Sequence, residues 1–316
     1  MRCLCCGKET LNNETWHPSC EKKFFGTSVL PEISINNDLL LELAKKSVNK
    51  GITVTGVQKK MSLHLDNDGK TPRLTLINYP SGYILKPQTE EYEALPEAEY
   101  LVMSMALATG IATVPHALMK IGKDNESLAY ITKRIDRLSQ TDMLAMEDFC
   151  QLDERLTEDK YKGSYERCAK IIDQYSYQPG LDKAELYMRL VFCFVTGNSD
   201  MHLKNFSLIE TSESSGRYKL SAAYDLLPVS VILPEDTEQT ALTLNGKKKR
   251  IKCEDFLQYA DSIGVPEKAA FNMIKKVTSM KDQYIKMCEE SYMPEQMKES
   301  LKSLIENRVS VLSQRI

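Results

Sequence analysis

The chain has 316 residues, of which 42% are hydrophobic and 27% charged, and its formal net charge is −3. This length and composition allow one large domain or two lobes with a proper core. The charge balance gives no reason to expect direct binding to nucleic acid or to an anionic membrane. No apolar run approaches the roughly 18 residues that span a bilayer.

The cysteines and the first residues of the chain bear on its compartment. The chain holds nine cysteines, an odd number, and most of them lie in apparent core segments. It begins MRCLCCGKE, without the apolar core of a signal peptide. These features argue against a disulfide framework and predict a reducing, cytoplasmic location.

The first residues carry two close pairs of metal-binding side chains. Cys3 and Cys6 are separated by two residues, as are His17 and Cys20. Four thiolate or imidazole ligands in this pattern are typical of a tetrahedral structural zinc site, where the metal replaces a core that so short a segment cannot build. The alternative is a set of buried or incidental thiols, which one further nearby cysteine outside both pairs would favour. We expect residues 1–26 to form a zinc-binding knuckle.

A β-rich region is expected to follow. Residues 52–65, ITVTGVQKKMSLHL, predict a strand, a turn at Gly56 and a second strand. Backbone N–H groups in such a turn, with Lys59 and Lys60 beside them, would cradle phosphates. An ordinary hairpin is the alternative, because the segment has one glycine where protein kinases use three. Further strands are expected at residues 73–78, 83–86, 114–121 and 128–135.

The strand at residues 83–86, YILK, ends on a lysine. Kinases use an apolar strand ending in lysine to bring an ammonium group to the α- and β-phosphates of ATP. The alternative is that Lys86 is a solvated strand end. Residues 93–109 predict a helix that would offer Lys86 an acid. Glu97 and Glu99 lie roughly 200° apart around that helix, so at most one of them can pair with the lysine, and the angles slightly favour Glu99.

The remainder is expected to be mainly helical. The expected helices span residues 146–155, 164–175, 183–195, 252–263, 266–290 and 293–315. Short strands are expected at residues 206–209 and 219–224, and residues 242–251 predict a hairpin that turns at Asn245-Gly246.

Residues 197–208, GNSDMHLKNFSL, follow one of these helices directly. Asp200 and Asn205 match the D-x4-N spacing of the catalytic base and the metal-binding Asn in protein kinases, and Asp225 follows in AAYDLLP. One Asp would orient the attacking hydroxyl, while the Asn and the later Asp would hold Mg²⁺ against the phosphates. The alternative is that Asp200 merely caps a loop, as such residues often do.

Several of these segments together resemble one family. The order GVQKKMSL, YILKP, EAEYLVMSMALATGI, ITKRIDR, EDF, GNSDMHLKNFS, YDLLP and LTLNGKKK resembles the HipA family of bacterial toxin kinases, from about residue 27 to 316. The resemblance implies a Ser/Thr kinase of a toxin–antitoxin system, with a fold distantly similar to that of protein kinases. It also implies a separate antitoxin or small partner protein from a neighbouring gene.

The resemblance assigns roles to individual positions. It implies that Asp200 is catalytic, that Asn205 and Asp225 bind magnesium, and that Lys86 binds phosphates. It places the nucleotide loop and autophosphorylation candidates early in the chain, the adenine-binding hinge after the last strand, and two further ATP-binding residues in the helical region. These are Thr55, Gly56, Val57, Gln58 and Lys59 for the loop, Thr53 and Thr55 for autophosphorylation, Lys133 and Ile135 for the hinge, and His202 and Tyr224.

We therefore expect an α+β, two-lobed, protein-kinase-like fold with a knuckle at residues 1–26, a β-rich lobe at 27–135 and a helical lobe at 136–316. The expected reaction transfers the γ-phosphate of ATP to a Ser or Thr of a host protein, with Mg²⁺ and structural Zn²⁺ bound. We expect no membrane contact, and nucleic acid only through an antitoxin. Three alternatives remain: a non-catalytic ATP-binding scaffold, a small-molecule kinase, or a protein whose zinc module reads DNA or a partner.

Overall fold

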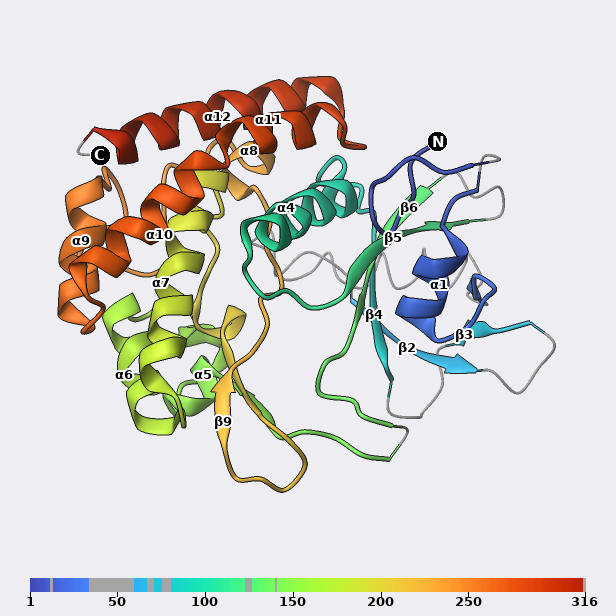
Figure 1. Cartoon of the computed structure of the whole chain (residues 1–316), viewed down its shortest axis with the longest axis horizontal. Helices are drawn as coiled ribbons and strands as arrows, with labels where there is room; N and C mark the ends of the chain where they lie inside the picture. Colours follow the sequence, from blue (N-terminus) through green and yellow to red (C-terminus); the bar gives the residue numbers. More distant parts are fainter. Residues whose placement is uncertain are drawn as a thin grey trace. The chain divides into compact units, whose positions relative to one another are not determined.

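The computed structural model describes residues 1–11, 14–33, 60–66, 71–75, 81–122, 127–139 and 141–314. The chain forms two compact units, coloured by sequence in Figure 1. The first unit comprises Met1–Tyr100 and Val114–Asp142, and the second comprises Leu101–Thr113 and Met143–Ile316. The segment Leu101–Thr113 is thus grouped with the helical unit, whereas the sequence predicts a division near residue 135.

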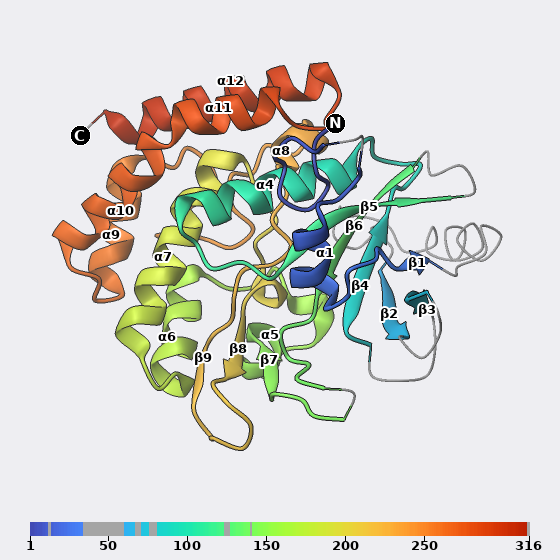
Figure 2. The same cartoon turned by 45° about the vertical axis from the view of Figure 1, so that its right-hand side comes forward.

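The first unit is built on a mixed sheet of six strands in the order β1-β3-β2-β4-β6-β5. Its elements are α1 (Pro18–Phe25), β1 (Glu32–Ile33), β2 (Met61–Asp66), β3 (Arg73–Thr75), β4 (Tyr83–Pro87), the start of α4 (Leu95–Thr109), β5 (His116–Ile121) and β6 (Ser127–Lys133). Among the described strands, every pairing in this sheet is antiparallel except that of β1 with β3. In both Figure 1 and Figure 2, β4 runs through the middle of this sheet.

Apolar side chains on the central strands form the core of this unit. Met61 and Leu63 on β2 are buried, with exposed Ser62 between them, as the period of two in a strand requires. Leu85 on β4 pairs with Ile131 on β6, and both are fully buried. Outside the sheet, α1 packs on β4, because the rings of Phe24 and Phe25 both contact Tyr83.

The second unit is mainly helical. Its elements, besides the rest of α4, are β7 (Met146–Asp148), α5 (Phe149–Leu152), η1 (Thr157–Asp159), α6 (Tyr165–Tyr175), α7 (Pro179–Thr196), η2 (Leu203–Asn205), β8 (Ser207–Glu210), β9 (Tyr218–Leu220), α8 (Val229–Ile232), α9 (Cys253–Ser262), α10 (Glu267–Ser279), α11 (Lys281–Glu289) and α12 (Glu295–Ser313). The strands form a small antiparallel sheet in the order β7-β8-β9.

Helix α7 forms the centre of the second unit. Every residue from Leu186 to Thr196 is buried, which is typical of a helix that is surrounded by packing partners. The helix packs against α6, α10 and α12, and α11 lies alongside α12 in Figure 1. A rigid central helix of this kind can aim the residues that follow its C-terminus.

Most predicted elements agree with the structure, and four differ from it. Residues 146–155 were expected to be one helix, but Met146–Asp148 pairs with β8 as a strand and only Phe149–Leu152 is α-helical. The expected helix at 266–290 is two helices, α10 and α11, separated at Met280. The expected hairpin at 242–251 is reduced to one bridge between Leu244 and Lys247.

The expected strand at 219–224 is also shorter than predicted. It is β9, Tyr218–Leu220, after which the chain leaves the sheet. The first half of the strand–turn–strand at 52–65 and the end of the strand at 73–78 lie outside the described residues.

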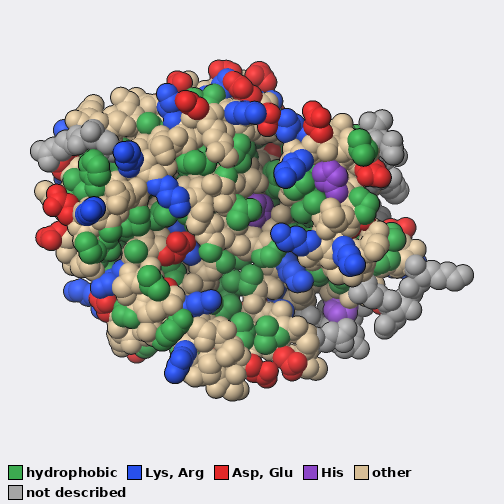
Figure 3. All heavy atoms as spheres, in the orientation of Figure 1, with side chains coloured by type: hydrophobic (Ala, Val, Ile, Leu, Met, Phe, Trp, Pro, Cys, Tyr) green, Lys and Arg blue, Asp and Glu red, His purple; other side chains and the backbone are tan. Residues whose placement is uncertain are grey.

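The described surface carries charges of both signs. Figure 3 shows Lys and Arg side chains interspersed with Asp and Glu on the face that it presents, in keeping with the small net charge of −3. Among the described residues, we find no helix that combines the length and apolar character of a membrane span.

Candidate functional site

The segment from Gly197 to Asp200 is placed by the end of α7. Gly197 adopts the left-handed conformation, with φ of 71°, and its N–H donates to the carbonyl groups at the helix end. A Cβ at this position would lie 2.3 Å from Leu304 Cδ2, so only glycine fits without displacement. The Asn198 side chain then accepts a hydrogen bond of 3.2 Å from the Asp200 N–H. The end of helix α7 and the turn closed by the Asn198 side chain together fix the position of Asp200.

Asp200 and Asn205 are brought together, as the five-residue spacing requires. The Asn205 amide Nδ2 donates a 2.8 Å hydrogen bond to the Asp200 carbonyl oxygen, and both residues are buried. Because Nδ2 has this partner, the Asn205 amide oxygen is the atom that remains to act as a metal ligand. The Asp200 carboxylate accepts a 2.6 Å hydrogen bond from the Tyr161 hydroxyl.

Tyr161 is a candidate that the sequence analysis did not identify. It lies just after η1, about forty residues before Asp200, so spacing gives no sign of the contact. Its ring also meets that of His202, edge to face, with 4.9 Å between the ring centroids. His202 is buried, and its ring packs on the tyrosine whose hydroxyl bonds to the Asp200 carboxylate.

Asp225 lies in the loop that follows β9. Its φ of 56° is unusual for a residue other than glycine, and such conformations often occur at functional sites. The preceding Tyr224 hydroxyl contacts Ser207 Oγ at 2.6 Å and donates to the Lys204 carbonyl at 3.1 Å. These bonds attach the Asp225 loop to the residue before Asn205. The Tyr224 hydroxyl therefore has structural partners, and its predicted part in ATP binding stays a prediction.

The first unit contains a buried ion pair. Lys86 on β4 and Glu99 on α4 lie 2.6 Å apart, Nζ to Oε1, and their exposed fractions are 2% and 0%. The Lys86 ammonium also lies 5.4 Å from the centroid of the Tyr130 ring. Glu97 is half-buried, and burial raises the pKa of its carboxyl. The structure thus pairs the lysine with Glu99, which helical angles alone only slightly favoured.

The predicted hinge residues lie at and beyond the end of β6. Lys133 is the last residue of this strand, and its N–H donates to the Pro115 carbonyl at 3.0 Å. Ile135 follows it, beside the ion pair of Arg134 and Asp136. The predicted nucleotide loop and autophosphorylation residues Thr53, Thr55, Gly56, Val57, Gln58 and Lys59 lie outside the described residues.

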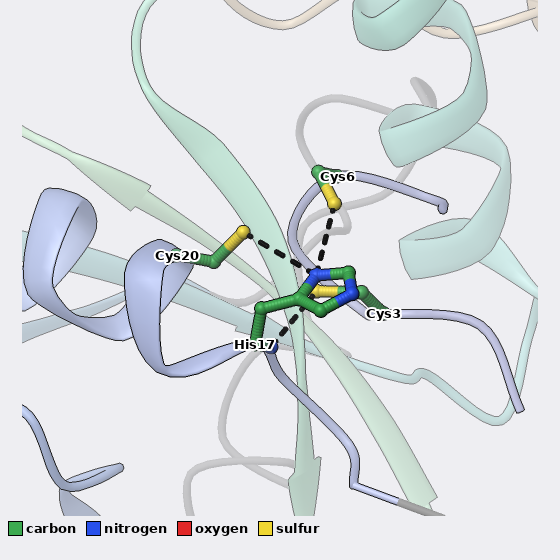
Figure 4. A group of neighbouring side chains, drawn as sticks. All are labelled: Cys3, Cys6, His17 and Cys20. Carbon is green, nitrogen blue, oxygen red and sulfur yellow. Dashed lines mark hydrogen bonds between the residues drawn. The ribbon is translucent and has the colours of Figure 1, made fainter. Parts of the chain in front are cut away.

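The four predicted zinc ligands form a cluster at the chain's N-terminus, drawn in Figure 4. One ligand atom from each of Cys3, Cys6, His17 and Cys20 lies within 4.8 Å of all the others. His17 Nδ1 faces the thiols, 3.4 Å from Cys6 Sγ and 3.8 Å from Cys20 Sγ.

The second ring nitrogen of His17 has a different partner. Nε2 lies 3.0 Å from the Glu9 carbonyl oxygen, to which it donates when protonated. This bond leaves Nδ1 deprotonated and turned toward the sulfurs, as metal-ligating histidines require. Each of the nine cysteines is a free thiol. The donor set of three sulfurs and one nitrogen fits tetrahedral Zn²⁺.

Comparison with known proteins decides the family. The model of the HipA-like C-terminal domain matches residues 52–284, well over half of the chain. The chain belongs to this HipA-like family. Its match to a protein of Haemophilus influenzae named "Putative kinase" is 26% identical over 294 residues and covers 84% of this chain and 82% of that protein. "Putative kinase Y4dM" of Sinorhizobium fredii is 29% identical over 237 residues, which cover 71% of this chain and 56% of that protein.

Solved structures show the same HipA-like fold. The HipA chain of Shewanella oneidensis, solved with HipB and operator DNA, matches with a TM-score of 0.72 and 18% identity, over 91% of this chain and 76% of that one. The proinflammatory kinase CtkA of Helicobacter pylori matches with a TM-score of 0.56 and 16% identity, over 81% of this chain and 96% of that one. At these identities the likeness concerns the fold, which is the α+β kinase-like class that the sequence predicts.

Proposed function

We propose that this HipA-like chain transfers the γ-phosphoryl group of ATP to a Ser or Thr of another protein, as the toxin of a toxin–antitoxin system. The observation that carries the proposal is the buried Lys86–Glu99 ion pair between a strand and a helix. Protein kinases use a Lys–Glu pair of this kind to hold the phosphates of ATP. A buried ion pair is a poor way to gain stability, so its presence in a HipA-like fold favours a functional reason.

The second unit would supply the remaining chemistry. Asp200 would orient the attacking hydroxyl and accept its proton, with Tyr161 fixing the rotamer of its carboxylate. The Asn205 amide oxygen and the Asp225 carboxylate would hold Mg²⁺, which neutralises charge on the phosphates when it is bound. His202 would lie near the phosphates and Tyr224 near the nucleotide.

The remaining assignments rest on the family. Thr55 to Lys59 would form the nucleotide loop, Lys133 and Ile135 would contact adenine, and Thr53 or Thr55 would accept a phosphate in autophosphorylation. We retain the proposed division into residues 1–26, 27–135 and 136–316, and a cytoplasmic location. Cys3, Cys6, His17 and Cys20 would hold a structural Zn²⁺.

A partner protein is part of the proposal. The Shewanella oneidensis HipA was solved with HipB and its operator DNA. By this likeness, a small antitoxin encoded nearby would bind the present chain, and any contact with DNA would be made through that partner.

Incubating the purified chain with labelled ATP and Mg²⁺ tests the proposal. We expect label to enter the chain itself and a small number of host proteins, with mass spectrometry locating it at Thr53 or Thr55 and at substrate Ser or Thr residues. Label that appears only in small molecules of a cell extract would indicate a small-molecule kinase. Nucleotide binding without any transfer would indicate a regulatory scaffold.

A further inference from the structure

The metal-ligand cluster is physically connected to the Lys86–Glu99 ion pair, through a contact with helix α4. Cys5 stands between the ligands Cys3 and Cys6, and its carbonyl oxygen accepts a 3.3 Å hydrogen bond from the Tyr100 hydroxyl. Tyr100 is the residue after Glu99 on this helix and is buried. A displacement of the knuckle loop would therefore act on the turn of α4 that carries Glu99.

A second connection runs through the sheet. The Leu118 N–H donates to the Leu4 carbonyl at 2.8 Å, and the Trp16 Nε1 donates to the Leu118 carbonyl at 3.2 Å. Both main-chain groups of this β5 residue are thus bonded to the knuckle. Leu118 pairs with Tyr130 on β6, and Tyr130 pairs with Lys86 on β4. Directly paired side chains share one face of a sheet, so a single row leads from the knuckle to the lysine.

The ring of His116 joins the two connections. It meets the Tyr100 ring at 5.9 Å and 65°, and it stacks on the Tyr130 ring at 6.2 Å and 18°. His116 and both tyrosines are buried. The helix residue beside Glu99 and the strand residue beneath Lys86 therefore pack on the same imidazole. Because interiors are closely packed, a shift at one of these rings displaces its neighbours.

The knuckle itself has little apolar material to hold its shape. Its buried rings are Trp16, Phe24 and Phe25, which contact one another. Segments this short usually need a metal or a disulfide to fold stably. The geometry of the Leu4 and Cys5 carbonyl groups thus depends on whether a cation closes the four-ligand cluster.

We propose that Zn²⁺ bound by Cys3, Cys6, His17 and Cys20 strengthens nucleotide binding, by fixing the Lys86–Glu99 pair through Tyr100 and through the Leu118–Tyr130 row. Tyr100 is in this scheme a positioning residue. The inference rests on the proposed function, because it takes Lys86 as the phosphate ligand. Coupling between two binding sites is reciprocal, so nucleotide must tighten the binding of Zn²⁺ by the same factor.

The experiment measures both sides of this coupling on the full chain. Trp16 is the only tryptophan and precedes His17, so its fluorescence reports Zn²⁺ binding in titrations buffered with a chelator. We expect a non-hydrolysable ATP analogue with Mg²⁺ to tighten Zn²⁺ binding about fivefold or more, within the usual range of such coupling. Calorimetry should show that Zn²⁺ tightens binding of the analogue by an equal factor.

Two matched variants test the route. Tyr100→Phe removes the hydroxyl that reaches Cys5. Tyr259→Phe removes a buried hydroxyl of the second unit that donates to the Tyr165 carbonyl at 3.1 Å and belongs to neither of the two connections. We expect Tyr100→Phe to reduce the coupling severalfold and Tyr259→Phe to preserve it. An equal loss in both variants would show that general loosening is responsible, and would overturn the role of Tyr100.

The outcomes also separate this inference from the proposed function. If the zinc-loaded chain binds no ATP analogue, the proposed function fails and the inference fails with it. Equal affinity for the analogue with and without Zn²⁺ overturns the inference alone. If chelation unfolds the first unit, the affinity for the ATP analogue is compared between the two variants in their zinc-loaded form. Equal affinity in the two variants contradicts the proposal.

Discussion

Each of the two units contains one polar pair that the proposed function uses, and the two pairs are assembled in different ways. Asn205 bonds to the main chain of Asp200, five residues away, at the end of a buried helix. Lys86 and Glu99 come from a strand and a helix and are joined by a charged hydrogen bond of 2.6 Å between two side chains with almost no exposure. The first pair follows from local chain geometry, whereas the second needs its surroundings to remain in place. Mutation of the first pair should therefore affect mainly phosphoryl transfer, whereas mutation of the second pair should also lower the stability of the fold.

The largest effect is expected at Asp200. Asp200→Asn keeps the size of the side chain but removes the proton acceptor, so phosphoryl transfer should fall about a thousandfold or more while nucleotide affinity stays nearly unchanged. Initial rates with labelled ATP and calorimetry measure the two quantities. Asp261→Asn, an exposed carboxylate on α9, is the matched control and should have normal activity. Substantial transfer by Asp200→Asn would remove Asp200 from the catalytic role.

Lys86→Met should instead affect stability as well as binding. It leaves the Glu99 carboxylate buried without its cation, which costs about 3–5 kcal/mol in comparable cases. Urea unfolding followed by Trp16 fluorescence reports on the first unit. The double variant Lys86→Met, Glu99→Leu should recover most of the stability without recovering nucleotide binding. Lys120→Met, at a half-buried lysine on β5, is the control; an equal loss of nucleotide binding there would argue against a specific role for Lys86.

The pH dependence of stability should sharpen the contrast between the two pairs. The reason is that His116, a buried titratable residue, belongs to the first unit, which contains Lys86 and Glu99. Burial lowers the pKa of His116 from 6.5 to about 4, although its contact with the Val114 carbonyl opposes this. The groups that face it are the neutral rings of Tyr100 and Tyr130, with Lys86 over the latter. Between these two pKa values the unfolded chain binds the proton and the folded chain does not.

Stability is therefore complete above about pH 6.5 and falls as the pH drops toward 4, by about 3 kcal/mol in total. Urea unfolding followed by Trp16 fluorescence across this range gives the slope. His116→Asn retains a donor for the Val114 carbonyl and should lack this component of the slope. An identical pH dependence in the variant would show that other groups account for it.

The smallest effect is expected from Tyr161→Phe. Losing one hydrogen bond to a carboxylate should slow phosphoryl transfer by about tenfold or less and leave nucleotide affinity unchanged. Tyr165→Phe is a close comparison, because its hydroxyl donates to the Met201 carbonyl rather than to Asp200 itself. We expect Tyr161→Phe to alter the pH profile of transfer and Tyr165→Phe not to do so. Matching pH profiles would reduce Tyr161 to a structural residue.

Sequence patterns were most informative where the deciding contacts are local. The end of α7 at Gly197 appears in the structure as predicted, and so does the strand that carries Lys86, which continues one residue further, to Pro87. So does the assembly of the four cysteine and histidine ligands. Errors arose where a distant partner decided the conformation. Met146–Asp148 is a strand because it pairs with β8, about sixty residues later, and its helical pattern gave no sign of that partner.

The sequence by itself determined the family, the fold class and the residue types available for chemistry, because these follow from composition, spacing and motif order. The tertiary structure decided which residues act on one another. It paired Lys86 with Glu99 rather than Glu97, placed Tyr161 against Asp200, and joined the metal cluster to α4 through Tyr100. These contacts link segments whose separation along the chain carries no periodic signal, so only packing of the folded chain could specify them.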